Sequence, residues 1–311
     1  MHATVNRNKR SLALDLHDPR GREIFLRLAA RADVVIENFR PGTLDAWGCG
    51  YAAVRALRHD VVYISISGFG QWGPQTGELG YDPLAQAAGG FLSLNGAPDG
   101  EPVKAPTFLA DDLAGLHAAF ATLAALRHRD RTGEGQHVDV ALLDAMLFQS
   151  TGYLTLGALD VPLPRLGNQF RIAAPANTYR CRDGHILAGV LLDSHWKRLA
   201  ALIGRPVVGA GVPAARVQTY ADAARSPHVA AREMLQPADA PGRGEIPVVG
   251  PAAKLSRTPV SVRSGAPALG AHDDEILAEL GIAAEERRAL REAGVVGAAR
   301  GEPVSVRRDA D

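Results

Sequence analysis

Two neighbouring aspartates, Asp111 and Asp112, stand at the start of the longest helical pattern in the chain. Aspartate is a favoured N-cap, and negative charge is stabilised at a helix N-terminus, so capping is the ordinary interpretation of such residues. A second interpretation is chemical, because a carboxylate can attack an acyl donor and form a mixed anhydride. One aspartate can cap the helix and leave the other free, and the pattern alone does not choose between these uses.

A glycine-rich segment at residues 68–73 reads GFGQWG and follows the strongest predicted strand, so it matches the G-x-G-x-x-G fingerprint of dinucleotide sites. That fingerprint needs a helix to begin there, with its N-terminus facing a pyrophosphate. Pro74 and Gly77 follow instead, and no helix is predicted before Pro83. We therefore interpret the segment as a loop whose backbone approaches a ligand closely, and not as a nicotinamide site.

Three other polar side chains near these segments have simpler interpretations. His117 lies on a helix rich in alanine, and we expect it to be a structural histidine. Tyr81 and Asp82 follow the glycine-rich segment after residues 74–80, and both fit a turn. From the residues alone, none of the three is predicted to take part in chemistry.

The composition narrows the class of protein. Of the 311 residues, 34 are basic and 34 are acidic, and this neutral balance argues against a broad nucleic-acid or membrane surface. Cys49 and Cys181 are the two cysteines, which gives no metal-binding spacing and no disulfide framework, and indicates a reducing compartment. The sequence shows no signal-peptide pattern and no apolar run of transmembrane length. We expect a cytoplasmic protein without a metal site, a nucleic-acid partner or a membrane.

The elements that must position the aspartates alternate between strand and helix over residues 1–150. Predicted strands lie at 11–16, 33–37, 60–67 and 137–142, and predicted helices at 23–30, 44–47, 51–57, 83–94, 113–129 and 143–154. The first of these helices has Asp18 as its cap and Pro19 at its first position. Such alternation is typical of an α/β domain with a parallel sheet that is covered by helices on both faces.

The rest of the chain has a different character. Residues 151–175 form a proline-rich linker, and residues 176–235 begin with a hairpin around Asp183-Gly184, so a second, smaller α+β domain is expected there. Residues 236–300 contain an irregular stretch at 237–267 and helices at 273–293, and 301–311 is predicted to be a disordered tail.

Seven short stretches, taken in order, resemble the class III CoA-transferases, the CaiB/BaiF superfamily. This family includes formyl-CoA transferase, carnitine CoA-transferase and alpha-methylacyl-CoA racemase. The order and spacing hold to about Ala145, and the similarity resumes in patches to Val296. Each stretch alone is unspecific and the ordered set is specific: they are 6–11 (NRNKRS), 37–42 (ENFRPG), 68–74 (GFGQWGP), 80–82 (GYD), 110–111 (AD), 131–136 (RTGEGQ) and 269–272 (LGAH).

The resemblance implies a Rossmann-like large domain, a smaller α+β domain and an intertwined homodimer. It implies an acyl-CoA:carboxylate CoA-transferase in which Asp111 attacks the thioester and CoA thiolate leaves, while Asp112 keeps the capping role. The partners are then an acyl-CoA donor and a carboxylate acceptor, and the CoA thioester is a substrate, with no permanently bound cofactor or metal. The glycine-rich loop is expected to fold over the intermediate and keep water out. The residues implied at the CoA site are Asn38, Phe39, Arg40, Gly68, Gly70 and Tyr81.

Two alternatives within the same family stay open. The racemase branch needs a histidine where this chain has Tyr81, and a phenol is a poor match for an imidazole base, which favours the transferase. The family also normally has a strand-helix-strand unit before Asn6 and a further helical stretch after Pro206. Formyl-CoA transferase has basic residues where this chain has His17 and Ala46. A catalytically impaired, truncated homologue is therefore the other alternative.

Overall fold

The computed structural model describes residues 2–170, 173–202 and 212–297 of the chain. The chain divides into two compact units, one made of residues 32–46 and 50–218, and the other of residues 1–31, 47–49 and 219–311. The predicted disordered tail at 301–311 and the segment after Ile203 lie outside the described residues.

A parallel sheet is the framework of the unit that contains residues 50–218. Its strands are β1 (Val34–Glu37), β2 (Val62–Ser67) and β3 (Gln136–Ala141), in the order β1-β2-β3. The middle strand β2 is buried along almost its whole length, as expected for a parallel strand that is covered on both faces. The predicted α/β fold with a parallel sheet is therefore confirmed.

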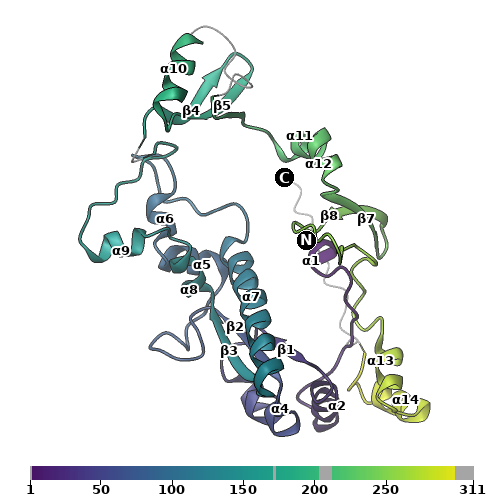
Figure 1. Ribbon diagram of the computed structural model, residues 1–311. Coiled ribbons are helices and arrows are strands. Elements are labelled where there is room, and N and C mark those ends of the chain that lie inside the picture. The colour runs from purple at the N-terminus through teal and green to yellow at the C-terminus, as the bar shows by residue number, and fades with distance from the viewer. Residues whose placement is uncertain (1, 171–172, 203–211, 298–311) are drawn as a thin grey trace, which may run out of the picture. The chain divides into compact units, whose positions relative to one another are not determined.

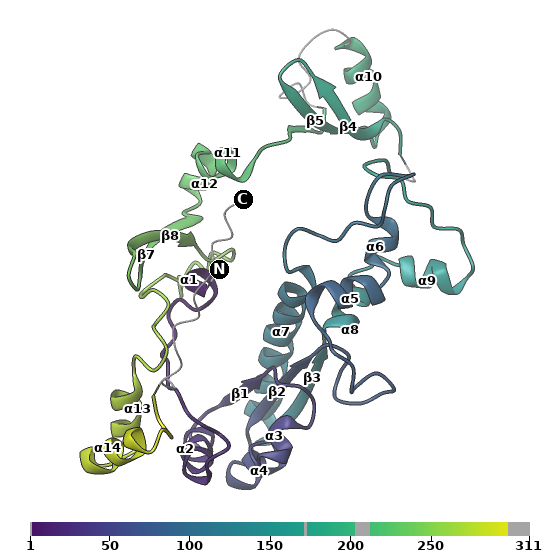
Figure 2. The ribbon, with the colours of Figure 1, turned by 180° about the vertical axis from the view of Figure 1, so that it is seen from behind.

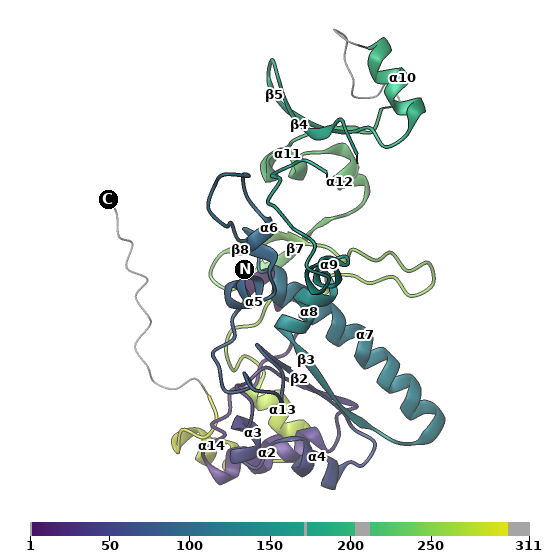
Figure 3. The same ribbon diagram turned by 90° about the vertical axis from the view of Figure 1, so that its left-hand side faces the viewer.

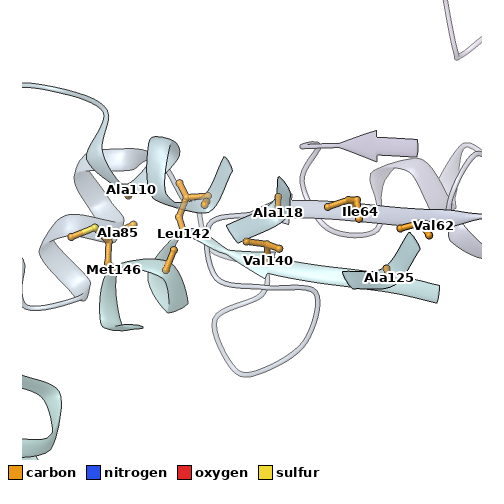
Figure 4. Packing of buried hydrophobic residues seen from close by; sticks show 11 residues of the cluster. Val62, Ile64, Ala85, Ala110, Ala118, Ala125, Val140, Leu142 and Met146 are labelled. Atoms are coloured by element: carbon orange, nitrogen blue, oxygen red, sulfur yellow. The ribbon is translucent and has the colours of Figure 1, made fainter. Parts of the chain in front are cut away.

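Helix α7 (Leu109–Thr132) lies along one face of this sheet (Figures 1 and 3). Its contact face is made of small residues at helical spacing, which lets the helix approach the strands closely. These alanines pack with Val62, Ile64 and Val140 in the core cluster of Figure 4; they are Ala110, Ala114, Ala118 and Ala125.

Helices α3 (Thr43–Ala46) and α4 (Tyr51–Leu57) lie on the other face of the sheet (Figure 2). The ring of Tyr51 stacks on His137 of β3, with ring centroids 5.0 Å apart. The sheet is thus covered on both faces, as the alternation of elements predicted.

Two predicted helices are each divided in the structure. Residues 83–94 form α5 (Asp82–Ala88) and α6 (Phe91–Leu94), and residues 143–154 fall in α8 (Leu142–Phe148) and α9 (Tyr153–Ala158). Gly90 takes a left-handed φ of 77° between the first two, and Gly152 takes 86° between the second two. A residue in this region cannot continue an α-helix, so each glycine ends the pattern locally.

A second sheet within the same unit contains β4 (Ala176–Cys181), β5 (Gly184–Gly189) and β6 (Ala214–Arg216), all antiparallel. The first two strands form the hairpin that Asp183-Gly184 predicted. Helix α10 (Asp193–Ala201) follows them.

The other unit joins the N-terminal and C-terminal parts of the chain. Ile24 packs into a core cluster with Leu277, Leu280, Ile282, Leu290, Val295 and Val296. Asp18 caps the second helix by accepting a hydrogen bond from the Arg20 amide, as predicted. The elements of this unit are α1 (His2–Val5), α2 (Pro19–Ala29), α11 (Tyr220–Ala224), α12 (Pro227–Ala231), β7 (Leu235–Ala240), β8 (Gly244–Val249), α13 (Asp273–Glu279) and α14 (Ala284–Glu292).

The predicted strand at 11–16 is wrong. Only Leu14 forms a β-bridge there, an isolated one to Val296. The Asp15 amide donates to the Val295 carbonyl (3.0 Å) and the Ala13 amide donates to the Asp273 carboxylate, 2.9 Å away. The backbone of this segment is thus satisfied by loop and side-chain acceptors, and no regular ladder forms among the described residues.

The irregular stretch predicted at 237–267 is also partly wrong, because β7 and β8 form an antiparallel hairpin that begins at Leu235 and occupies its first part. Pro237 and Pro247 stand opposite each other and hide the alternating pattern in the sequence. Proline is tolerated in a two-stranded sheet because both strands are edges. Gly242 and Gly244 take the left-handed φ values that the turn requires.

Candidate active site

Helix α7 begins at Leu109, one turn earlier than predicted, so Asp111 and Asp112 lie inside its first turn. Its N-cap residue is Phe108, whose side chain makes no capping hydrogen bond. The Asp112 amide donates to the Phe108 carbonyl (2.9 Å). The prediction that Asp112 caps this helix is therefore wrong, and Asp111 is not its cap either.

A cleft of about 580 Å³ opens in front of Asp111. It lies where the loops after β1 and β2 meet the start of α7, at the carboxyl end of the parallel strands. Ligands of open α/β sheets bind at this end. Of the predicted residues, those that line the cleft together with Asp111 are Asn38, Phe39, Arg40, Gly68 and Tyr81.

Gly70 does not line this cleft, and it lies at the base of the glycine-rich loop. Its amide donates to the Ser67 hydroxyl (3.1 Å), and its φ of 89° is left-handed. In the structure Gly70 therefore shapes the loop and does not line the cleft.

The glycine-rich loop extends from Gly68 to Gly80, and these two glycines close it at its base. A Cβ added to Gly68 would lie 2.2 Å from the Cα of Gly80, so neither position has room for a side chain. The Gly68 carbonyl accepts from the Leu143 amide (3.1 Å), and the Gln71 amide donates to the Asp139 carboxylate (2.9 Å). No helix follows until Asp82 in this fully described stretch, which agrees with the rejection of a dinucleotide fingerprint.

The segment after β1 forms the facing wall of the cleft. The Glu37 carboxylate accepts from the Phe39 amide (2.8 Å), and Phe39 is 43% exposed. The Arg40 guanidinium donates to the Gly77 carbonyl and so contacts the glycine-rich loop. This wall presents an apolar ring and a cation to a bound molecule, which suits a ligand with both apolar and anionic parts.

The surroundings of Asp111 raise the pKa of its carboxyl above the ordinary value, first by partial desolvation and then through the charges of Asp82 and Asp112. Asp111 is exposed to solvent, and neighbouring protein atoms still displace part of the water around its carboxyl group. The carboxylate is therefore accessible from the cleft and less stabilised than one in free water.

A buried polar network beside Asp111 was missed from the sequence. Asp82, interpreted there as a turn residue, is buried at the start of α5, and it accepts from the Ala110 amide (2.7 Å) and from Gln86 Nε2 (2.7 Å). Gln86 in turn accepts from the Ala105 amide (2.8 Å). The sequence offered one signal for this network: Asp82 and Gln86 are spaced i, i+4 among small apolar residues, which places both polar side chains on one face of a helix.

His117 lies away from this cleft and packs edge-on against Phe148, with ring centroids 5.1 Å apart. Its Nε2 is buried and makes no hydrogen bond within the part of the chain that is described. Among those same residues, no group of three or more His, Cys, Asp and Glu side chains is arranged to hold a metal ion.

The protein-family model described as CoA-transferase family III matches residues 1–210 and 207–273. The chain belongs to CoA-transferase family III. The predicted family is therefore confirmed, and so is its class of enzyme.

Relatives of this family III CoA-transferase carry names that agree. The succinyl-CoA:mesaconate CoA-transferase of Haloarcula hispanica is 36% identical over 90% of this chain and 81% of its own length. The succinate–glutarate CoA-transferase of Agrobacterium fabrum is 34% identical over 90% of this chain and 80% of its own.

A solved structure of a CaiB/BaiF family protein from Brucella suis is 32% identical to this family III CoA-transferase. It aligns with a TM-score of 0.80 over 90% of this chain and 83% of that one. The match supports the α/β fold described above. CoA-transferases, the class of enzyme to which the chain belongs, use CoA thioesters as substrates.

Proposed function

We propose that this CoA-transferase moves CoA from an acyl-CoA to a carboxylic acid through an acyl-aspartyl anhydride at Asp111. The observation that carries the proposal is the position of this carboxylate: it is not used as a helix cap, and it opens into the cleft lined by Asn38, Phe39 and Tyr81. Those residues belong to the stretches that resemble the family's CoA site.

The reaction consists of three balanced exchanges. A carboxylate oxygen of Asp111 attacks the thioester carbonyl carbon, the C–S bond breaks, and CoA leaves as the thiolate. The acceptor carboxylate then attacks the aspartyl carbonyl carbon, and the donor acid leaves as its carboxylate. The thiolate finally attacks the acceptor's acyl carbon, which releases the new thioester and restores the carboxylate of Asp111.

The surroundings of Asp111 suit the first exchange. Only the ionised form can attack, and the raised pKa of this carboxyl corresponds to a more basic and more nucleophilic carboxylate than an ordinary aspartate. We propose that Asn38, Phe39 and Arg40 lie along CoA, and that the loop held by Gly68 and Gly70 excludes water from the anhydride.

The names of the relatives suggest the first substrates to test. Succinyl-CoA:mesaconate and succinate–glutarate CoA-transferases both act, by name, on short dicarboxylic acids. We propose succinyl-CoA as the donor and a short dicarboxylic acid as the acceptor. Arg40, which lines the cleft, is a cation able to pair with an anionic group of such a ligand.

We also propose that the protein acts as a homodimer. Apolar side chains on the outer face of α7 and on α8 are exposed in the single chain: Leu116, Phe120, Leu123 and Phe148. By length and composition α7 could cross a membrane, which is weak evidence because its other face packs on the sheet. An apolar stripe of this kind fits the matching surface of a second copy.

The predicted division of the chain and the predicted compartment stay part of the proposal. We propose a large CoA-binding domain at 1–150, a linker at 151–175, a small domain at 176–235 and a returning segment at 236–300. This functional division differs from the two compact units, in which residues 1–31, 47–49 and 219–235 group with the C-terminal part. A chain with two cysteines and no disulfide framework suits the cytoplasm.

The decisive experiment is capture of the acyl-enzyme. The protein is incubated with succinyl-CoA, treated with hydroxylamine or borohydride, digested and analysed by mass spectrometry, with Asp112→Asn as the matched control. A mass change at Asp111 in both proteins supports the proposal. The proposal is contradicted if folded protein shows no mass change at Asp111 with a broad panel of acyl-CoAs. If the acyl-CoA takes up deuterium from the solvent at its α carbon and no adduct forms, the protein is a racemase.

A further inference from the structure

The first turn of α7 takes a hydrogen-bond acceptor from another helix. The Ala110 amide is fully buried, and its acceptor is the Asp82 carboxylate of α5, 28 residues earlier in the chain and 2.7 Å away. A buried backbone N–H without a partner is costly, so this contact helps to define where α7 can begin.

The Asp82 side chain is fixed in place from both of its oxygens. One oxygen accepts from Ala110, and the other accepts from Gln86 Nε2 at 2.7 Å. Gln86 is completely buried and is itself held by the Ala105 amide, 2.8 Å from its Oε1. Rotation of Asp82 would leave several buried polar groups without partners, so its carboxylate stays beside the first turn of α7.

Asp111 directly follows the residue that Asp82 caps. The charge of Asp82 acts on the Asp111 carboxylate from α5, and Asp112 acts on it from the same helix, and both raise its pKa. The other ionisable side chains that face this cleft come from the wall after β1, from the glycine-rich loop and from the residue before α5; they are Glu37, Arg40, Glu78 and Tyr81.

We propose that Asp82 is a positioning residue for the transfer reaction, which caps α7 in place of Asp111 and repels the resting Asp111 carboxylate. The repulsion at Asp111 disappears when this residue is acylated, because the acylated side chain carries no charge on its own carboxyl group; the distal carboxylate of the succinyl group keeps its charge. Asp82 therefore favours formation of the acyl-enzyme without touching the substrate. This inference rests on the proposed function, in which Asp111 is the nucleophile.

The first test is Asp82→Asn, measured by the single-turnover rate of acyl-enzyme formation from succinyl-CoA across pH. Asparagine keeps an oxygen for the Ala110 amide but removes the charge. We expect the acid limb of the profile to move to lower pH, and the rate above that limb to fall on the order of tenfold. Gln86→Met is the structural control: it breaks the network but keeps the charge, so its acid limb stays in place.

A second variant separates the charge from the hydrogen bonds. Asp82→Asn combined with Gln86→Glu can keep every bond of the network, because the new amide donates to the new carboxylate, while the charge moves away from Asp111. We expect it to recover the thermal stability lost in Asp82→Asn but not the rate or the position of the acid limb.

The possible outcomes are distinct. If the wild type forms no adduct at Asp111, the proposed function fails and this inference fails with it. If the wild type forms the adduct, and the folded variants without a charge at position 82 keep its rate and its acid limb, the role of Asp82 is overturned alone. The double variant gives this answer even if Asp82→Asn does not fold.

Discussion

The negative charges near the Asp111 carboxylate change its pKa and, with it, the reactivity proposed for this residue. Asp82 and Asp112 both act on it, and partial burial adds to their effect, so its pKa is raised. The ionised form of Asp111 is therefore less stable in the folded chain than in the unfolded chain. The same arrangement that makes it reactive therefore destabilises the fold above its folded pKa.

The variant Asp111→Asn tests this directly. With a raised folded pKa, the native state binds the proton more tightly than the unfolded state, so the stability contributed by Asp111 falls as pH rises through the folded pKa. We expect the variant to be more stable than the wild type at pH 7, by less than about 1 kcal/mol because solvent screens the exposed side. Urea unfolding at pH 7 and below the ordinary value of 3.8 measures it, since the gain should vanish at the lower pH.

The catalytic consequence of the same change is separate. Without the nucleophile no anhydride forms, so transfer from succinyl-CoA should fall by about a thousandfold or more, with no adduct after borohydride treatment. Near-normal turnover by a folded Asp111→Asn protein would show that another group carries the chemistry.

At the scale of elements, the glycine-rich loop depends on a close approach between two backbone segments. Gly68 follows β2 and Gly80 precedes α5, and they meet where a side chain has no space. The loop between them supplies Glu78 and Leu79 to the cleft. The distance between β2 and α5 therefore sets the shape of the site.

Gly68→Ala should spread these two segments. We expect a loss of about 1–3 kcal/mol of folding stability from overpacking, and a higher KM for the acyl-CoA as the cleft is deformed. Gly77→Ala is the matched control in the same loop, since its Cβ would meet no atom within 4 Å. Thermal unfolding and steady-state kinetics of both variants make the comparison. Equal stability and equal KM in the two variants would contradict the role of the close approach between Gly68 and Gly80.

At the scale of the whole molecule, the outer face of α7 is an apolar surface that the single chain leaves exposed. Phe120 is 74% exposed and Phe148 is 75% exposed, and both lie on helices that border the core of the parallel sheet. Large aromatic rings contribute strongly to association when they are buried at an interface.

Phe120→Glu should weaken the proposed homodimer by at least about 2 kcal/mol, because a buried unpaired charge is added and an aromatic contact is lost. Size-exclusion chromatography with light scattering should show a monomer for this variant and a dimer for the wild type. Leu57→Glu, at an exposed leucine on α4, is the control that should stay dimeric. A wild-type protein that is monomeric at micromolar concentration would rule the proposal out.

The local sequence already determined the strands β1, β2 and β3, the cap of α2, the hairpin at Asp183-Gly184 and the ordered motifs of the family. These features depend on periodicity, turn residues and neighbours in the chain, which a sequence displays directly. Tertiary structure decided where α7 begins and that neither Asp111 nor Asp112 caps it. The acceptor for Ala110 comes from Asp82, 28 residues away, and no local pattern encodes a hydrogen bond between separate helices.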